Sequence, residues 1–285
     1  MIAPDRRLSI LSLTGATSDP HGWTDKAVVS SFGVSVRVLT DDATLLSALC
    51  KRLPPCARTK PTAAVDLQYS MYSRPTASDR GKVQPMYVGH SSAGMFVETL
   101  DQARACEAFE STVQFDVAST SKDWVFVHAG VVVHDGAAIV IPAPSTHGKS
   151  TLVDALVRAG ATYYSDEYAA IDGQGRVHPF RIPLSLRTGD GGKRRVAIGD
   201  DAPALPPVPI RTIVATRHEP GASWQPRRGT AAESVLTLLS NTVRARIAPR
   251  AALDVLARAA GGAVLLEGPR GDADLVAPQL LKESR

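Results

Sequence analysis

The chain has 285 residues, 44% of them hydrophobic, and its 32 basic and 28 acidic side chains give a formal net charge of +4. This length is enough for one large domain or two smaller ones, each with its own core. Acidic and basic residues are interspersed, and there is no aromatic-rich basic strand and no zinc-finger spacing. These features argue against a nucleic-acid-binding protein.

The three cysteines, Cys50, Cys56 and Cys106, lack metal-ligand spacing, so we expect free thiols in a reducing compartment. The N-terminal sequence has no long apolar stretch, and no run of about 18 apolar residues occurs anywhere. We therefore expect a cytoplasmic protein without a membrane partner. Homo-oligomerisation is left open.

Residues 1–119 are predicted to form an N-terminal α+β domain. Residues 1–20 are poorly patterned, 27–40 are strand-like, and 42–53 read as a helix capped by Asp41 or Asp42. No chemical motif or internal repeat appears here. The further elements expected are strands at 63–73, 85–90 and 94–100, a turn at 74–83, and a helix at 101–120.

Residues 120–285 have a different pattern, typical of an α/β domain. Residues 123–143 predict two apolar strands joined by a tight turn at His134–Gly136, which implies a mixed or antiparallel neighbourhood. The second strand leads into a loop and a helix that ends at Gly160. The rest is expected to comprise a strand, acidic tip, strand and Gly-rich turn at 162–180, then loops alternating with helices at 230–247 and 249–260, a strand at 262–268 and a closing helix.

The segment "PAPSTHGKST" resembles a phosphate-binding loop at the start of a helix. Successive backbone N–H groups at such a start, together with the helix dipole, favour an anion. Lys149 is expected to reach the β- and γ-phosphates, and the Ser150 hydroxyl to bind Mg²⁺. The full predicted nucleotide-binding set is Ser145, Thr146, His147, Gly148, Lys149, Ser150 and Thr151.

This loop departs from the usual G-x-x-x-x-G-K-[ST] pattern. Ala143 replaces the first glycine, and Pro144 cannot donate an N–H. Thr146 and His147 stand where small residues are common, and His147 is interpreted either as a phosphate contact or as an exposed side chain. The sequence thus leaves open a working nucleotide site or one that has lost its function.

Three motifs in order resemble HPr kinase/phosphorylase and its broader kinase relatives. They are "VHAGVVV" with His128, the loop "PAPSTHGKST", and "YYSDEYAAI" with Asp166 and Glu167. The resemblance covers 123–171 firmly and the following residues more loosely. It implies a P-loop mixed sheet of the type shared with phosphoenolpyruvate carboxykinase, preceded here by the N-terminal α+β region.

The resemblance also implies roles for individual residues. His128 would lie near the reacting phosphate, although "VHAG" inserts an alanine into the family's "HG" pair. Asp166 would be the base for the attacked hydroxyl, and Glu167 would help to hold the metal together with Ser150. Arg187 in "PLSLRTGD" is the candidate for the family's phosphate-binding arginine.

Each of these features also has a simpler interpretation. His128 in an apolar strand fits a satisfied core histidine, and Asp166-Glu167 fit a solvated turn. The run 189–196 is either a mobile lid over the site or a solvated loop. His134, His178 and His218 lack metal spacing and receive no role; the G-K-S triplet alone would be a weak signal.

We therefore expect a kinase that uses ATP, or GTP, and Mg²⁺ to phosphorylate a hydroxyl group. The first expectation for the acceptor is a serine in a peptide or small protein, since relatives of this shape phosphorylate ribosomally made peptides, lasso peptides among them. HPr itself is not expected, because the family's C-terminal recognition motif is not seen. The alternatives are a small-molecule hydroxyl kinase and a nucleotide-binding switch or scaffold without catalysis.

Overall fold

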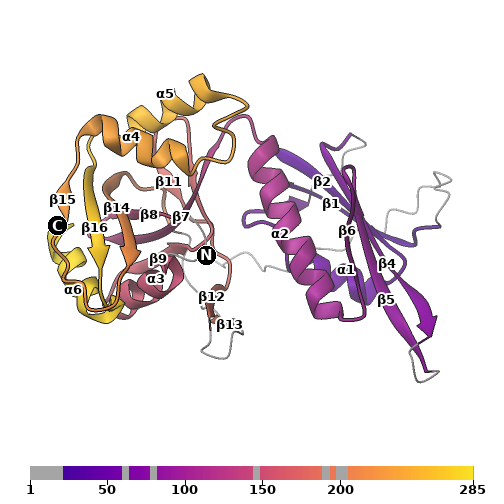
Figure 1. The fold of residues 1–285 in the computed structure, drawn as a ribbon. Coiled ribbons are helices and arrows are strands. Elements are labelled where there is room, and N and C mark those ends of the chain that lie inside the picture. Colours follow the sequence, from indigo (N-terminus) through magenta and orange to yellow (C-terminus); the bar gives the residue numbers. More distant parts are fainter. Residues whose placement is uncertain are drawn as a thin grey trace, which may run out of the picture. The chain divides into compact units, whose positions relative to one another are not determined.

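The computed structural model describes residues 22–59, 64–77, 82–143, 148–187, 193–196 and 205–284. The chain divides into two compact units, Met1–Ser121 and Lys122–Arg285 (Figure 1). Six helices and several sheets of mixed strand direction lie in this part of the chain, which places the protein in the mixed α/β class. No helix among these residues is long and apolar enough to cross a membrane.

The first unit is a six-stranded sheet in the order β3-β1-β2-β4-β5-β6, with helix α1 packed on β1 and β2 and helix α2 packed on β5 and β6. Asp42 and Asp101 cap the two helices, because each side chain accepts two backbone N–H bonds of the first turn. The elements are β1 (Asp25–Ser31), β2 (Val34–Thr40), α1 (Ala43–Cys50), β3 (Arg58–Thr59), β4 (Leu67–Ala77), β5 (Val83–Ser91), β6 (Gly94–Thr99) and α2 (Gln102–Thr120).

Two predictions for this unit need correction. The segment 27–40 is a hairpin rather than one strand, because Phe32 and Gly33 both adopt positive φ and reverse the chain. The turn expected at 74–83 begins later, because β4 continues to Ala77 opposite Val83 of β5. Pro75 lies opposite Pro85, in a part of β4 beyond its pairing with β2, which ends at Met71, so β2 requires no N–H from Pro75.

The second unit is built on an eight-stranded sheet in the order β11-β10-β7-β8-β14-β16-β15, with β9 also paired to β7. A separate two-stranded sheet joins β12 and β13. The elements are β7 (Val125–His134), β8 (Ala137–Pro142), α3 (Lys149–Arg158), β9 (Thr162–Ser165), β10 (Tyr168–Ile171), β11 (Val177–His178), β12 (Leu184–Arg187), β13 (Lys193–Val196), β14 (Ile210–His218), β15 (Arg227–Arg228), α4 (Ala231–Ser240), α5 (Pro249–Ala260), β16 (Val264–Arg270) and α6 (Ala273–Glu283).

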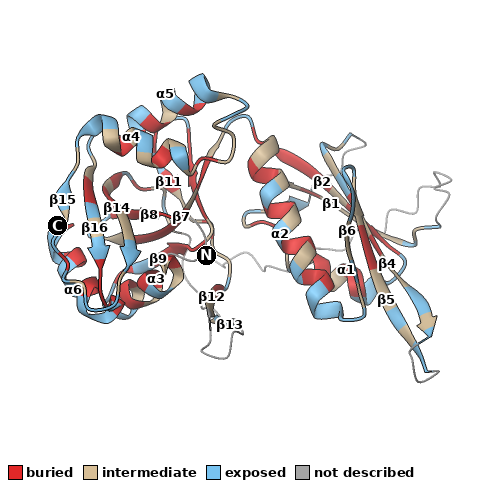
Figure 2. Ribbon diagram, in the orientation of Figure 1, coloured by how far each residue is buried: buried red, intermediate tan, exposed pale blue. Residues whose placement is uncertain are grey.

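Helices cover both faces of this sheet: α3 and α6 pack on one face, and α4 and α5 on the other. Figure 2 shows the buried strands between these two pairs of helices. Strand β8 is buried on both sides. Ile139 and Ile141 join a core with α3 and α6, whereas Ala138 and Val140 join a second core with α4 and α5. This alternation follows from the two-residue period of a strand and explains why β8 is a continuous apolar run.

The direction of the strands changes at β8. The predicted β7–β8 hairpin is confirmed, since Asp135 and Gly136 both have positive φ and His134 pairs with Ala137. On its other side β8 is parallel to β14, which is in turn parallel to β16. The carboxyl ends of these parallel strands therefore lie at the edge where the loop between β8 and α3 begins.

The sequence analysis missed strand β14 and misjudged one helix. Residues 210–218 were expected among loops and helices, but they form a central strand. Helix α4 ends at Ser240 rather than near 247, and the chain then forms a bridge from Thr242 to Val127 of β7. Gly160 follows the cap residue Ala159 of α3 in a left-handed conformation. The predicted α5, β16 and closing helix are confirmed.

Candidate functional site

Helix α3 begins at Lys149, directly after the loop predicted to bind phosphate. Ala143, which replaces the usual first glycine, is buried at the end of β8, and Gly148 has a left-handed φ of 77°. Thr151 is exposed. The predictions for Ser145, Thr146 and His147 concern residues outside the described part of the chain.

The Lys149 side chain lies buried across the sheet and reaches the segment that follows β9. Its Nζ donates a hydrogen bond to the backbone oxygen of Asp166 and lies 4.0 Å from Oδ1 of the same residue. Gly130 of β7 makes room for this path: a Cβ there would lie 2.5 Å from Cγ2 of Val153 and 3.2 Å from Cγ of Lys149. Burial lowers the pKa of Lys149, and the nearby charges of Asp166 and Glu167 oppose this shift.

Asp166 and Glu167 lie in a break within an extended segment rather than at the tip of a hairpin, which corrects the prediction. Strands β9 and β10 both run antiparallel to β7, with Ser165 opposite Val131 and Tyr168 opposite His128. The break is held by the Ser165 hydroxyl, which accepts from the backbone N–H groups of Glu167 at 3.1 Å and Tyr168 at 3.0 Å. These hydrogen bonds fix the backbone conformation of Asp166 and Glu167.

The Asp166 carboxyl is buried beside the start of α3. It is 6% exposed, so the alternative of a solvated turn does not describe it. Burial raises its pKa to about 6, while Lys149 and a hydrogen bond from the Ser150 side chain act in the opposite direction. Its Oδ1 atom has no hydrogen-bond partner within the described residues. A buried acceptor of this kind is costly, and such atoms are common where a ligand or proton is handled.

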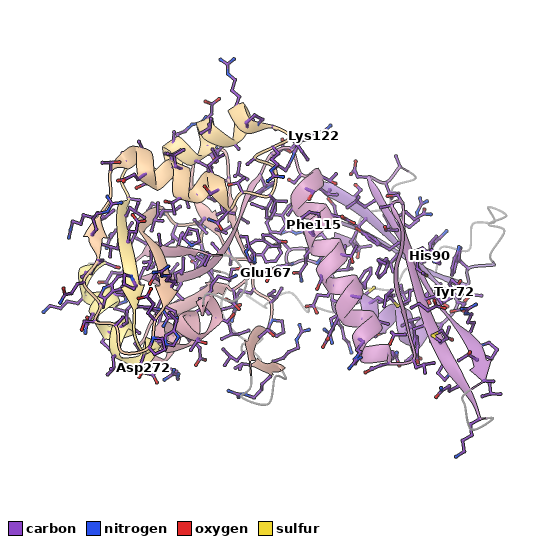
Figure 3. The ribbon with its side chains drawn as sticks, in the orientation of Figure 1. Tyr72, His90, Phe115, Lys122, Glu167 and Asp272 are labelled. Atoms are coloured by element: carbon purple, nitrogen blue, oxygen red, sulfur yellow. The ribbon has the colours of Figure 1, made fainter. Side chains whose placement is uncertain are left out.

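Glu167 and His128 form a second pair beside the first. Oε1 of Glu167 lies 3.4 Å from Nε2 of His128, and the Glu167 side chain is 41% exposed. Figure 3 labels Glu167 among the side chains of the second unit. His128 packs its ring edge against Tyr168, and its backbone N–H donates to Asn241 at 2.8 Å. Because the His128 ring is half-buried and faces an acid, it is not a histidine enclosed by apolar neighbours.

The structure thus brings together Lys149, Ser150 and Asp166, with His128 and Glu167 alongside. For Arg187 only the backbone is described, and it ends β12 opposite Lys193; the prediction for its side chain concerns atoms outside the described part of the chain. Of the run 189–196, the described residues form β13, which is paired to β12, and the rest lies outside the described part.

Arg270 and His218 were missed by the sequence analysis. Both end parallel strands, β16 and β14, and they are direct neighbours in the sheet. Nη2 of Arg270 donates to the Gly148 oxygen at 2.7 Å, across 122 residues of sequence. The signal that could have revealed them is their place at the carboxyl ends of strands parallel to β8, but this requires β14 to be recognised.

Metal binding by protein atoms alone is not seen, since no group of three or more His, Cys, Asp or Glu in the described ranges is placed to hold an ion. Magnesium in phosphoryl-transfer sites instead takes one or two protein oxygens and completes its shell with phosphate and water. The Ser150 side chain, at the start of α3, is an oxygen donor that fits this requirement. Glu167, the other predicted metal residue, faces His128.

A scan against protein-family models finds no match for the chain, and a search of curated proteins finds none. A helix start, a buried lysine and a buried acid meet at the carboxyl edge of parallel strands, which is typical of sites for phosphate groups.

Proposed function

We propose that the protein is a kinase that uses ATP or GTP with Mg²⁺ to phosphorylate a hydroxyl group. The observation that carries this proposal is the meeting of Lys149, at the start of α3, with the buried carboxyl of Asp166. Phosphoryl transfer requires mainly positioning and neutralisation of charge, which a helix start and a buried ammonium supply.

The fold that we propose for the second unit is the P-loop mixed sheet of HPr kinase and phosphoenolpyruvate carboxykinase. It is supported by the antiparallel β7–β8 hairpin that precedes the loop and by the parallel β14 on its other side. In common P-loop folds the loop strand lies among parallel neighbours, so this mixed environment favours the resemblance over an ordinary P-loop protein.

In the proposed reaction Asp166 takes the proton of the acceptor hydroxyl. A pKa of about 6 leaves most of this carboxyl ionised at neutral pH, yet close enough to that pH to accept a proton. The hydroxyl oxygen forms a bond to the γ-phosphorus, the bond to the bridging oxygen breaks, and the nucleoside diphosphate leaves. Lys149 stabilises the charge of the transferred group, and Ser150 with Glu167 would hold the Mg²⁺ that neutralises the phosphates.

His128 is proposed to lie near the reacting phosphate, and Glu167 to help to hold the metal. Glu167 follows Asp166 in the chain, its carboxylate lies beside the His128 ring, and His128 lies opposite Tyr168 in the sheet. The acceptor that we propose is a serine of a peptide or small protein, following the resemblance, in a cytoplasmic setting consistent with the free thiols of Cys50, Cys56 and Cys106.

Calorimetric titration with ATP and GTP, with and without Mg²⁺, tests the first step. Wild type should bind in a Mg²⁺-dependent manner, and Lys149→Ala should lose this binding. Arg158→Ala is a matched control on the same helix, because Arg158 is exposed and pairs with Asp154 and Asp274 away from the loop. Wild type that binds neither nucleotide at millimolar concentration would refute the kinase assignment.

A further inference from the structure

Arg270 is a buried cation directly behind the start of α3. The residue is 2% exposed. Its Nη2 donates to the Gly148 oxygen at 2.7 Å and its Nη1 to the Gly271 oxygen at 2.9 Å. Its Nε has no partner within the described residues, and neither bond is made to a carboxylate. Burial lowers the pKa of this guanidinium, and the charge of Asp272 acts in the opposite direction.

A buried guanidinium bonded only to neutral carbonyl groups is an expensive arrangement. A hydrophobic side chain of similar size would fill the same space without removing a charge from water. The presence of an arginine here is explained if a bound anion supplies the negative charge that the protein does not place beside the guanidinium. The start of helix α3 is a site of the kind that binds anions, and Arg270 donates a hydrogen bond to the Gly148 carbonyl there.

Gly148 and Arg270 fit each other sterically. Gly148 has φ of 77°, and a Cβ on it would lie 2.7 Å from Nη2 of Arg270, so another residue there would strain the backbone and displace the guanidinium. The Gly148 oxygen also accepts the backbone N–H of Leu152 at 3.1 Å. Two donors therefore fix the orientation of the peptide between Gly148 and Lys149.

The orientation of that peptide determines where its N–H points. A trans peptide is planar, with its N–H opposite to its C=O. Because Arg270 and Leu152 hold the Gly148 oxygen, the N–H of Lys149 is directed the opposite way, out of the helix start. Backbone N–H groups in this position are the ones that bind phosphate at a helix start.

We propose that Arg270 is a positioning residue of the nucleotide site. It fixes the Gly148 carbonyl so that the first N–H groups of α3 face the polyphosphate of a nucleoside triphosphate, and it adds positive charge beside the start of α3. This inference rests on the proposed nucleotide binding. It assigns a role to a residue from the last strand of the sheet, outside the three motifs that carry the family resemblance.

The test compares Arg270→Met and Arg270→Lys with wild type by calorimetry, using Mg-ATP and inorganic tripolyphosphate with Mg²⁺ as ligands. Arg217→Met is the matched control, because Arg217 is an exposed arginine of β14 paired with Glu219. Arg270→Met should weaken both ligands by roughly ten- to hundredfold, as expected for loss of a charged donor, and the control should leave both unchanged.

Arg270→Lys should fold, because it keeps the buried charge, and should bind both ligands several-fold more weakly, since an ammonium cannot reproduce the two-pronged contact. If Arg270→Met does not fold, the affinity of Arg270→Lys for the two ligands decides whether Arg270 positions the site. A lower melting temperature with wild-type affinity for both ligands would overturn the proposal and leave Arg270 a structural residue. Wild type that binds neither ligand would instead refute the nucleotide site itself.

Discussion

The ammonium nitrogen of Lys149 lies 4.0 Å from Oδ1 of Asp166, although one residue starts helix α3 and the other lies in the break between β9 and β10. At this distance the charges attract each other but do not share a hydrogen bond. Both side chains are buried, so each charge depends on the other and on what binds beside them.

Asp166→Asn should abolish phosphoryl transfer while nucleotide binding is retained. The amide keeps the shape of the side chain but cannot take the acceptor's proton, and loss of a general base typically slows a reaction by about 10² to 10⁴-fold. Transfer from labelled ATP and calorimetric affinity should be measured on the same preparation. Asp154→Asn, which removes a carboxylate paired with Arg158 on helix α3, is the control and should transfer phosphate as wild type does. Undiminished transfer by Asp166→Asn would remove Asp166 from the mechanism.

The stability of wild type should fall relative to Asp166→Asn as pH rises from about 4 to 7. The pKa of Asp166 is about 6 in the folded protein, above its ordinary value of 3.8, so the folded state binds this proton more tightly than the unfolded state. Its contribution to stability is complete below the lower value and is lost as pH passes the higher one. The difference should be on the order of 2–3 kcal/mol. Urea unfolding of both proteins at several pH values measures it, and parallel pH curves would contradict the raised pKa.

Gly130→Ala should lower stability and weaken Mg-ATP binding together. The added methyl group would overlap Val153 and press on the Lys149 stem, and such overpacking typically costs about 1–3 kcal/mol. Gly262→Ala is the matched control, because a Cβ at Gly262 meets nothing within 4 Å. Denaturant unfolding and calorimetry should be run on both variants. Wild-type nucleotide affinity in Gly130→Ala would show that the path of Lys149 tolerates displacement.

Asp101→Ala should destabilise the first unit by about 1 kcal/mol, because two backbone N–H groups of α2 lose their acceptor. Asp101→Asn should retain most of the stability, since the amide oxygen can still cap the helix. Circular dichroism during urea unfolding follows the loss. Equal stability of the alanine variant and wild type would mean that water replaces the cap without cost.

Local features of the fold were predictable from the sequence because they depend on neighbouring residues. The Asp-Gly turn at 135–136 requires positive φ twice, and this dipeptide is suited to it. The caps Asp42 and Asp101 could likewise be read from their positions before apolar periodic segments. The mixed direction of the strands around β8 followed from the same hairpin.

Other features depend on contacts between distant residues and could not be predicted in this way. Strand β14 carries Arg211, Thr212 and Arg217 among its apolar residues, so it is recognised as a central strand only when β8 and β16 lie on either side. The break at Asp166 looks like a turn in the sequence, because acidic residues favour turns; only pairing of both flanking strands with β7 shows otherwise. The role of Arg270 requires knowledge of a carbonyl 122 residues away.

The break between β9 and β10 makes the length of this segment as important as its composition. Alternate residues of a strand face opposite sides of a sheet, so removal of either Asp166 or Glu167 would shift Tyr168–Ile171 by one position against β7. Every residue of β10 is buried, and each would then present its side chain to the opposite face of the sheet. An insertion or deletion in this segment should therefore destabilise the protein even where a change of residue type is tolerated.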